Sequence, residues 1–203
     1  MPETVLVPGA RDVRATLSSP DADASVCVVA CPPHPQYGGS RSDARLRAVA
    51  DALGERGVAC LRFDYGPWDE GRGERTDCRN AIAWAAERYD RVGLFGYSFG
   101  AGVALAVAGG DSDEAAVLCC VSVLAPPASH GSSDLVPAID AIEAPLQVLY
   151  GERDGTVEWT PVVEAARGRG AEVVALPGDH FFAGLGGRIG EAVAAFVASP
   201  CGP

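Results

Sequence analysis

Continuous apolar runs alternate along this chain with segments whose apolar residues recur at helical spacing. Residues 25–31, SVCVVAC, are typical of a strand covered on both faces of a parallel sheet. Residues 42–57 follow with four apolar residues on one helical face and with Asp43 as a capping residue. The same patterns predict further strands at 58–65, 91–97, 115–127, 144–151 and 171–176, and further helices at 75–89, 99–109, 160–168 and 185–198.

This alternation favours an open, mostly parallel sheet with helices on both faces. Residues 5–7 and 13–17 are expected to add a short antiparallel hairpin at one edge. Residues 128–140 are the one long irregular segment, and we expect them to form a surface loop. A short helix is expected just before the strand 144–151. Because 203 residues that are 48% hydrophobic can bury one sizeable core, residues 1–203 are predicted to form a single α/β domain.

The N-terminal sequence, the length of the apolar runs and the net charge limit the possible classes of function. The N-terminus lacks the pattern of a secretory signal, and the longest apolar run is too short to span a bilayer, so a cytoplasmic protein is expected. The formal net charge is −11, which disfavours nucleic-acid and membrane partners and leaves a small molecule as the expected partner. Patterns of this kind leave the oligomeric state open.

All 16 basic residues are arginine, and the chain contains no lysine. A GC-rich genome would produce this bias through codon use. Adaptation to a high-salt cytoplasm would also produce it, because salt screens the self-repulsion of an acidic surface. Both explanations remain open, and we take the second as a hypothesis.

Seven cysteines lie without C-x-x-C spacing, most of them inside apolar strands. Small buried thiols explain this distribution better than a disulfide framework or a zinc site. With only three histidines in the chain, no metal is expected.

The pentapeptide Gly96-Tyr97-Ser98-Phe99-Gly100 falls between a predicted strand and a predicted helix. In a chain with 25 glycines it could be an ordinary serine flanked by chance. Its context is that of a nucleophile elbow, in which a tight turn needs glycines two residues either side of the nucleophile. The helix N-terminus would also favour negative charge developing there. We therefore predict Ser98 as a nucleophile.

A serine nucleophile needs a base and a carboxylate that orients the base. Asp154 and His180 each follow a predicted strand, in the order expected after the serine. Taken singly, Asp154 could be a turn residue and His180 a loop histidine. Glu152 is the alternative acid, whereas Asp179 adjoins His180 and is poorly placed to accept from the same imidazole.

An oxyanion hole needs two N–H donors. Phe99 directly follows the nucleophile and is predicted to supply one. Gln36 is predicted to supply the other, with Tyr37 as the alternative, because Pro35 has no N–H. His34 could be a second base, but a role in holding this loop fits its position better.

HPQYGG, GYSFGA, GERD and GDHFF together resemble the α/β-hydrolase superfamily, and among its members the small, lidless, dienelactone-hydrolase-like branch. The resemblance spans residues 25–198. It implies an α/β-hydrolase fold and a cofactor-independent serine hydrolase that cleaves a carboxylic ester through an acyl-enzyme. True dienelactone hydrolases carry a cysteine nucleophile where this chain has Ser98, so opening of a dienelactone is not expected.

Residues 126–143, where this fold usually inserts its lid, are too few for a sizeable one. An open site for short acyl groups is therefore expected. A thioesterase or a small-peptide hydrolase would use the same triad, and a non-catalytic binding protein is the alternative from another class. His130 could reach the rim of the site, but it is expected to be a solvated loop residue. The predicted lining residues are His34, Tyr65, Trp68, Tyr97, Trp159 and Phe181, with Tyr37 beside them.

Overall fold

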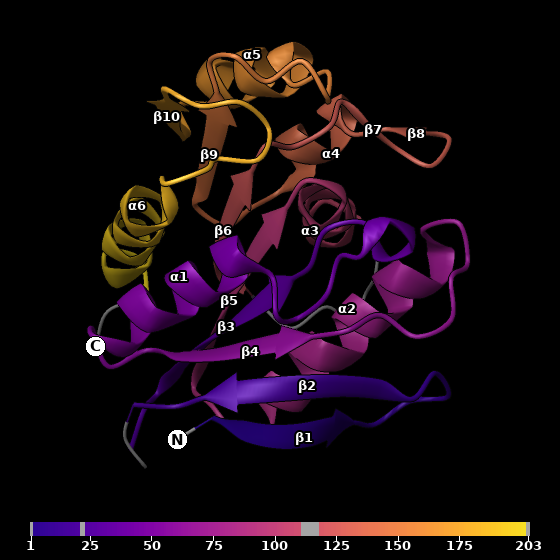
Figure 1. The fold of residues 1–203 in the computed structure, drawn as a ribbon, viewed down its shortest axis with the longest axis vertical. Coiled ribbons are helices and arrows are strands. Elements are labelled where there is room, and N and C mark those ends of the chain that lie inside the picture. Colours follow the sequence, from indigo (N-terminus) through magenta and orange to yellow (C-terminus); the bar gives the residue numbers. More distant parts are fainter. Residues whose placement is uncertain (1, 21–22, 111–117, 202–203) are drawn as a thin grey trace.

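An eight-stranded sheet in the order β1-β2-β4-β3-β5-β6-β9-β10 crosses the molecule (Figure 1). The computed structural model describes residues 2–20, 23–110 and 118–201. Strand β2 is antiparallel to both β1 and β4, and the other neighbouring pairs in the described chain are parallel, as predicted. The strands are β1 (Glu3–Val7), β2 (Val13–Ser18), β3 (Val26–Cys31), β4 (Ala59–Phe63), β5 (Arg91–Tyr97), β6 (Leu118–Leu124), β9 (Leu146–Gly151) and β10 (Glu172–Leu176). Residues 115–117 of the predicted strand 115–127 lie outside the described residues.

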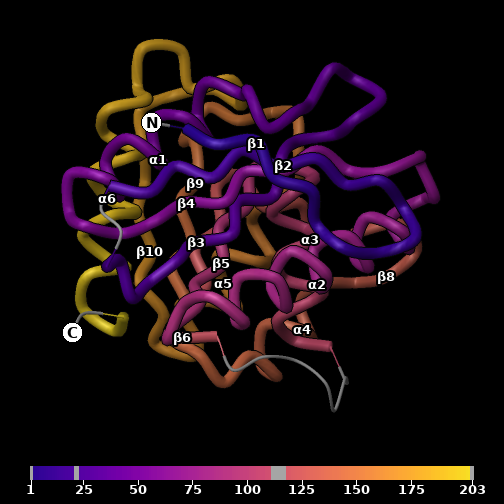
Figure 2. Tube along the Cα trace, turned by 90° about the horizontal axis from the view of Figure 1, so that it is seen from below, coloured from indigo at the N-terminus to yellow at the C-terminus, as the bar shows by residue number. Residues whose placement is uncertain are grey.

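Helices cover both faces of this sheet. Helices α1 (Ala44–Gly54) and α6 (Gly186–Ala198) pack on one face, and α2 (Arg72–Ala86), α3 (Phe99–Ala108) and α5 (Thr160–Gly168) pack on the other. Figure 2 shows α1 and α6 on the opposite side of the strands from α2 and α3. All six residues of β3 are buried and they alternate between the two cores, which is why that strand reads as a continuous apolar run.

Helix α2 begins at Arg72, one turn before the predicted start at residue 75. The capping group is the Glu74 carboxylate, which accepts hydrogen bonds from the backbone of Gly71 at 2.8 Å and of Asp69 at 3.0 Å. No serine, threonine, aspartate or asparagine occupies the cap position, so the usual start signal is missing from the sequence.

The prediction of a surface loop at residues 128–140 is wrong, whereas the short helix expected just before residues 144–151 is present. This segment forms the two-stranded pair β7 (Ser129–His130) and β8 (Ser133–Asp134) and most of α4 (Val136–Ala141), and it buries His130, Leu135 and Ile139. The side chain of His130 lies against Gly71 and Gly102, where an added Cβ would come within 2.6 Å and 3.1 Å of the imidazole. Two glycines distant in sequence therefore make room for this histidine.

The expectation that the cysteines are free thiols fails for one pair, because Cys119 and Cys201 form a disulfide. A bulge in β6 pairs Val92 with Leu118 but Gly93 with Cys120, which leaves Cys119 as the extra residue. An added Cβ on Gly93 would lie 3.0 Å from Cys120 Sγ and 3.8 Å from Cys119 Sγ, so the bulge turns both sulfurs to one face. The five other cysteines are free and buried, as expected.

A bilayer-spanning helix is absent from the described residues: none of their helices is long and apolar enough to cross a membrane.

Candidate active site

Ser98 lies at the turn between β5 and α3, with backbone angles of φ 56° and ψ −118°. A non-glycine residue pays strain energy in this region, which is typical of a nucleophile elbow. A Cβ on Gly96 would lie 2.2 Å from the Gly100 carbonyl oxygen, and one on Gly100 would lie 2.3 Å from that of Cys31. Both glycines are therefore required for the turn and for the close approach of β3.

A chain of hydrogen bonds joins the three residues predicted as a triad. Ser98 Oγ lies 2.9 Å from His180 Nε2, and His180 Nδ1 lies 2.7 Å from Asp154 Oδ2. Asp154 and His180 are 8% and 6% exposed, so this hydrogen-bonded pair is shielded from water. With Nδ1–H donated to the carboxylate, the Nε2 lone pair faces the serine hydroxyl, which is the tautomer that a general base needs.

The Asp154 carboxylate is fixed by the loop that follows β9. Its Oδ1 accepts hydrogen bonds from the backbone of Thr156 at 2.9 Å and of Val157 at 3.4 Å, while Oδ2 faces the histidine. Glu152, the alternative acid, is exposed, and Asp179 accepts from the Phe181 N–H instead.

His180 lies in the loop after β10, which two side chains hold in place. The Tyr97 hydroxyl donates to the His180 carbonyl at 2.8 Å, and Arg45 Nη1 donates to the Phe181 carbonyl at 3.1 Å. Burial raises the pKa of Tyr97 to about 12, so its hydroxyl stays protonated and remains a donor. The guanidinium of Arg45 also lies 4.7 Å from the centre of the Tyr97 ring.

The predicted oxyanion donors lie on the two loops expected. Within the described residues the Phe99 N–H makes no hydrogen bond, and it is left free at the N-terminus of α3. The Gln36 N–H donates to Nδ1 of His34 at 3.3 Å, a long bond that also gives His34 the loop-holding position expected of it. The alternative donor, Tyr37, is engaged, because its N–H donates to the His34 carbonyl at 3.1 Å in the 3-10 turn Pro35–Tyr37.

A cavity of about 630 Å³ opens at Ser98. The predicted lining residues His34, Tyr37, Trp68, Tyr97 and Phe181 all face it. Its walls are largely aromatic: the His34 ring centre lies 4.6 Å from that of Trp68 and 4.7 Å from that of Phe99. The remaining lining residues are Arg45, Glu70, Ser98, Phe99, Pro127, Ser129, His130, Gly131, Thr156, Val157 and His180.

Two predicted lining residues do not reach this cavity. Tyr65 is packed beneath it, donating to the Pro32 carbonyl at 3.2 Å and meeting the Phe99 ring edge-on. Trp159 stacks on Tyr150 with ring centres 4.3 Å apart. Both were predicted from their proximity to strand ends, which does not show where a side chain points.

The expectation that His130 is a solvated loop residue is wrong, and the alternative, that it reaches the site, holds. His130 is 3% exposed, lines the cavity, and its ring centre lies 4.7 Å from that of Phe99. Burial lowers the pKa of both His130 and His34, so both rings are neutral near pH 7. No local pattern marks His130, whereas Thr156 and Val157 could have been found as the residues that follow the predicted acid.

One group of potential metal ligands occurs among the described residues, away from this cavity. The sulfur atoms of Cys119, Cys120 and Cys201 lie within 4.8 Å of one another, but the disulfide engages two of them.

No protein-family model and no curated protein matches the chain. Several solved structures share its fold over nearly the whole length. An α/β serine hydrolase homologue from Coxiella burnetii is 25% identical, with a TM-score of 0.80 over 95% of this chain and 96% of that one. A serine hydrolase without a lid from Xanthomonas campestris is 24% identical, with a TM-score of 0.80 over 98% and 94%. Est1E from Butyrivibrio proteoclasticus is 17% identical, with a TM-score of 0.83 over 98% and 99%.

The eight-stranded sheet and its covering helices belong to a fold shared with these neighbours, one of which is described as lacking a lid, and the 126–143 segment of this chain is short. The serine hydrolase homologue from Coxiella burnetii, at 25% identity, supports a hydrolase function. The chain is therefore a member of the α/β-hydrolase superfamily, in a form without a lid.

Proposed function

We propose that the protein is a serine hydrolase that cleaves a carboxylic ester of a small molecule through an acyl-enzyme. The observation that carries this proposal is the continuous hydrogen-bonded path from Ser98 Oγ through His180 to Asp154, at 2.9 Å and 2.7 Å, at the base of an open cavity. The likeness to serine hydrolases and esterases supports it.

In the acylation step, Ser98 Oγ attacks the ester carbonyl carbon while its proton passes to His180 Nε2. The imidazolium that forms is stabilised by the Asp154 carboxylate. The carbonyl oxygen gains negative charge and accepts from the free Phe99 N–H, with Gln36 as the predicted second donor once its long bond to His34 is exchanged. The C–O bond then breaks, and the alcohol leaves with the proton from Nε2.

In the deacylation step, water takes the place of the alcohol. His180 removes a proton from the water as it attacks the acyl carbon, and the same donors hold the oxyanion. Collapse of the tetrahedral intermediate breaks the bond to Ser98 Oγ, which recovers its proton from His180 and releases the acid.

The cavity limits the substrates that fit this mechanism. At about 630 Å³ it accommodates a small ester rather than a long lipid chain. Its aromatic walls suit flat, apolar groups. One neighbour, Est1E, has been solved with ferulic acid bound, so a hydroxycinnamate ester belongs in the substrate panel beside short acyl esters and thioesters.

Fluorophosphonate labelling tests the nucleophile directly. The wild type, Ser98→Ala and, as a matched control, Ser133→Ala (an exposed serine on β8) are treated in low and molar KCl, and intact masses are measured. A single adduct on the wild type and on Ser133→Ala, absent from Ser98→Ala, is the expected result.

A folded wild type that takes no adduct in either salt would overturn the enzyme assignment and favour a binding protein. An adduct that persists in Ser98→Ala would place the nucleophile elsewhere. If labelling succeeds but thioesters or small peptides are cleaved far faster than esters, the bond type in this proposal is wrong while the mechanism stands.

A further inference from the structure

One wall of the cavity is carried by the loop between β4 and α2, residues 64–71. Trp68 lies at the middle of this loop, and its ring centre is 4.6 Å from that of His34 and 5.6 Å from that of Phe99. The Trp68 side chain is nevertheless 37% exposed, so contacts on one side alone cannot hold it still. The position of this wall depends on the backbone of the loop.

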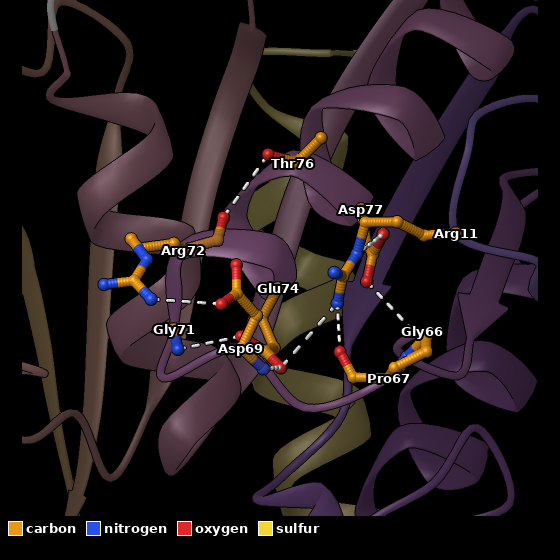
Figure 3. Close-up of polar contacts among 9 residues, drawn as sticks. All are labelled: Arg11, Gly66, Pro67, Asp69, Gly71, Arg72, Glu74, Thr76 and Asp77. Atoms are coloured by element: carbon orange, nitrogen blue, oxygen red, sulfur yellow. Dashed lines mark hydrogen bonds and ion pairs between the residues drawn. The ribbon is translucent and has the colours of Figure 1, made fainter.

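Four hydrogen bonds fix that backbone on both sides of Trp68 (Figure 3). Before the tryptophan, the Gly66 N–H donates to Asp77 Oδ2 at 2.9 Å, and the Pro67 carbonyl accepts from Arg11 Nη2. After it, the N–H groups of Asp69 and Gly71 donate to the two oxygens of Glu74 at 3.0 Å and 2.8 Å. The two residues that flank Trp68 are thus each bonded to a charged side chain.

These charged side chains form one buried group. The Glu74 and Asp77 side chains are fully buried, and Arg11, which reaches in from the β1–β2 turn, donates from Nε to Asp77 Oδ1 at 2.9 Å. Room for Arg11 depends on Gly73, where an added Cβ would lie 2.2 Å from Arg11 Cζ.

A buried ionic group of this kind is costly, because desolvation offsets most of the Coulombic attraction, and apolar side chains often stabilise a fold as well or better. Apolar side chains could not, however, accept hydrogen bonds from the three loop N–H groups or donate to the Pro67 carbonyl. The charged group therefore fixes the loop backbone, which apolar side chains of equal stabilising effect would not do.

We propose that Arg11, Glu74 and Asp77 are positioning residues that hold Trp68 as a rigid wall of the cavity and thereby determine which esters bind well. The proposal rests on the proposed ester hydrolysis. None of the three residues lines the cavity, so each acts on Trp68 through the loop.

The central variant is Arg11→Met, which keeps the length of the side chain but loses the bonds to Pro67 and Asp77. Arg169→Met is the matched control, because Arg169 is another half-buried arginine that donates to backbone carbonyls away from the cavity, those of Ile139 in α4 and of Ala144. In Arg11→Met/Asp77→Asn the charge left without its ion pair on Asp77 is also removed, which restores stability without restoring the bond to Pro67.

Two esters and one probe of Trp68 are measured in each protein. The esters are methyl acetate and 2-naphthyl butanoate, which is enlarged on both sides of the scissile bond. Acrylamide quenching of tryptophan fluorescence is recorded in the native background and in Trp68→Phe, since Trp68 is one of three tryptophans.

We expect Arg11→Met to raise KM for the large ester about tenfold, as expected for loss of an aromatic contact, with kcat changed by less than about threefold. Quenching should increase, and this increase should vanish in Trp68→Phe. The double variant should regain its Tm but keep the raised KM, whereas Arg169→Met should change Tm alone.

Unchanged quenching, or a raised KM that returns to normal together with Tm, would overturn the positioning role and leave the three residues purely structural. If the folded wild type hydrolyses neither ester and takes no fluorophosphonate, the proposed function fails instead. The quenching measurement separates the two failures, because it needs no activity.

Discussion

The two carboxylate oxygens of Asp154 have different hydrogen-bonding roles. Oδ1 accepts two backbone N–H groups of its own loop, while Oδ2 accepts Nδ1–H of His180 and so sets the tautomer of the ring. The bonds to Oδ1 position Asp154, and the bond to Oδ2 prepares His180 as the base. A substitution that keeps the bonds to Oδ1 but removes the bond from His180 tests the two roles separately.

Asp154→Asn is such a substitution. The amide oxygen can keep the bonds to Thr156 and Val157, but its NH₂ group faces His180 and favours the tautomer with the proton on Nε2, which cannot accept from Ser98. We expect kcat to fall by about 10⁴-fold with little change in KM. Steady-state kinetics on an ester that the wild type cleaves are the measurement.

Glu152→Gln is the matched control, because Glu152 precedes Asp154 by two residues but is exposed. It should keep kcat within about threefold, as a surface change distant from the reacting atoms. Asp154→Asn with more than a tenth of the wild-type kcat, or an equal loss in Glu152→Gln, would contradict this assignment of the acid.

At the scale of elements, sequence patterns predicted the features that depend on residues nearby in the sequence. The apolar runs of β3 and β5, the elbow glycines and the strand ends that carry Asp154 and His180 are local signals. The start of α2 and the fold of residues 128–140 are not. The first depends on the Glu74 carboxylate acting as a cap, and the second on His130 filling spaces beside Gly71 and Gly102 that only the folded chain creates.

Because His130 in β7 is buried, the stability of the folded protein depends on pH. Burial lowers the pKa of His130, and the charges of Arg75 and of a protonated His34 lower it further, whereas the Gly71 backbone and Glu74 raise it. In the unfolded chain the pKa of His130 is near its ordinary value of about 6.5. His130 therefore binds a proton in the unfolded chain at a pH where it stays neutral in the folded protein. The contribution of His130 to stability is complete above its unfolded pKa. It is lost as the pH falls from the unfolded pKa toward the lower pKa of His130 in the folded protein.

We expect His130→Phe to reduce the loss of Tm between pH 7.5 and pH 5.5, because phenylalanine keeps a ring against Phe99 but takes no proton. Thermal unfolding of both proteins across this range is the measurement. His34 is present in both proteins, so its own titration, in the same direction, contributes to both Tm profiles. Parallel Tm profiles for the two proteins would show that His130 does not titrate as its burial implies.

At the scale of the whole molecule, the site follows from topology, because parallel strands bring their carboxyl ends to one edge. Strands β3, β5, β9 and β10 end there, beside the loop of Gln36 and beside Ser98, Asp154 and His180. This placement was predictable from the order of the motifs. The link between Cys119 and Cys201 was not, since it joins residues 82 apart through a bulge that no sequence pattern announces.

The overall charge is a second property of the whole chain. A formal charge of −11 on 203 residues, with arginine as the one basic residue type besides histidine, destabilises the compact state through self-repulsion when salt is low. In molar salt the screening length falls to about 3 Å, so this repulsion largely disappears. If the composition reflects adaptation to a saline cytoplasm, the free energy of unfolding should rise steeply between low and molar KCl.

Urea unfolding at pH 7.5 in about 0.05 M and 2 M KCl measures this rise, and the same pair of curves near the isoelectric point of about 4.6 provides the control. At that pH the net charge is close to zero, so KCl has little repulsion to screen and should add much less stability. A large rise at pH 7.5 alone would assign the salt dependence to the acidic surface. An equal rise at both pH values would point to a general salt effect on apolar burial, and no rise would favour genome composition as the origin of the lysine-free sequence.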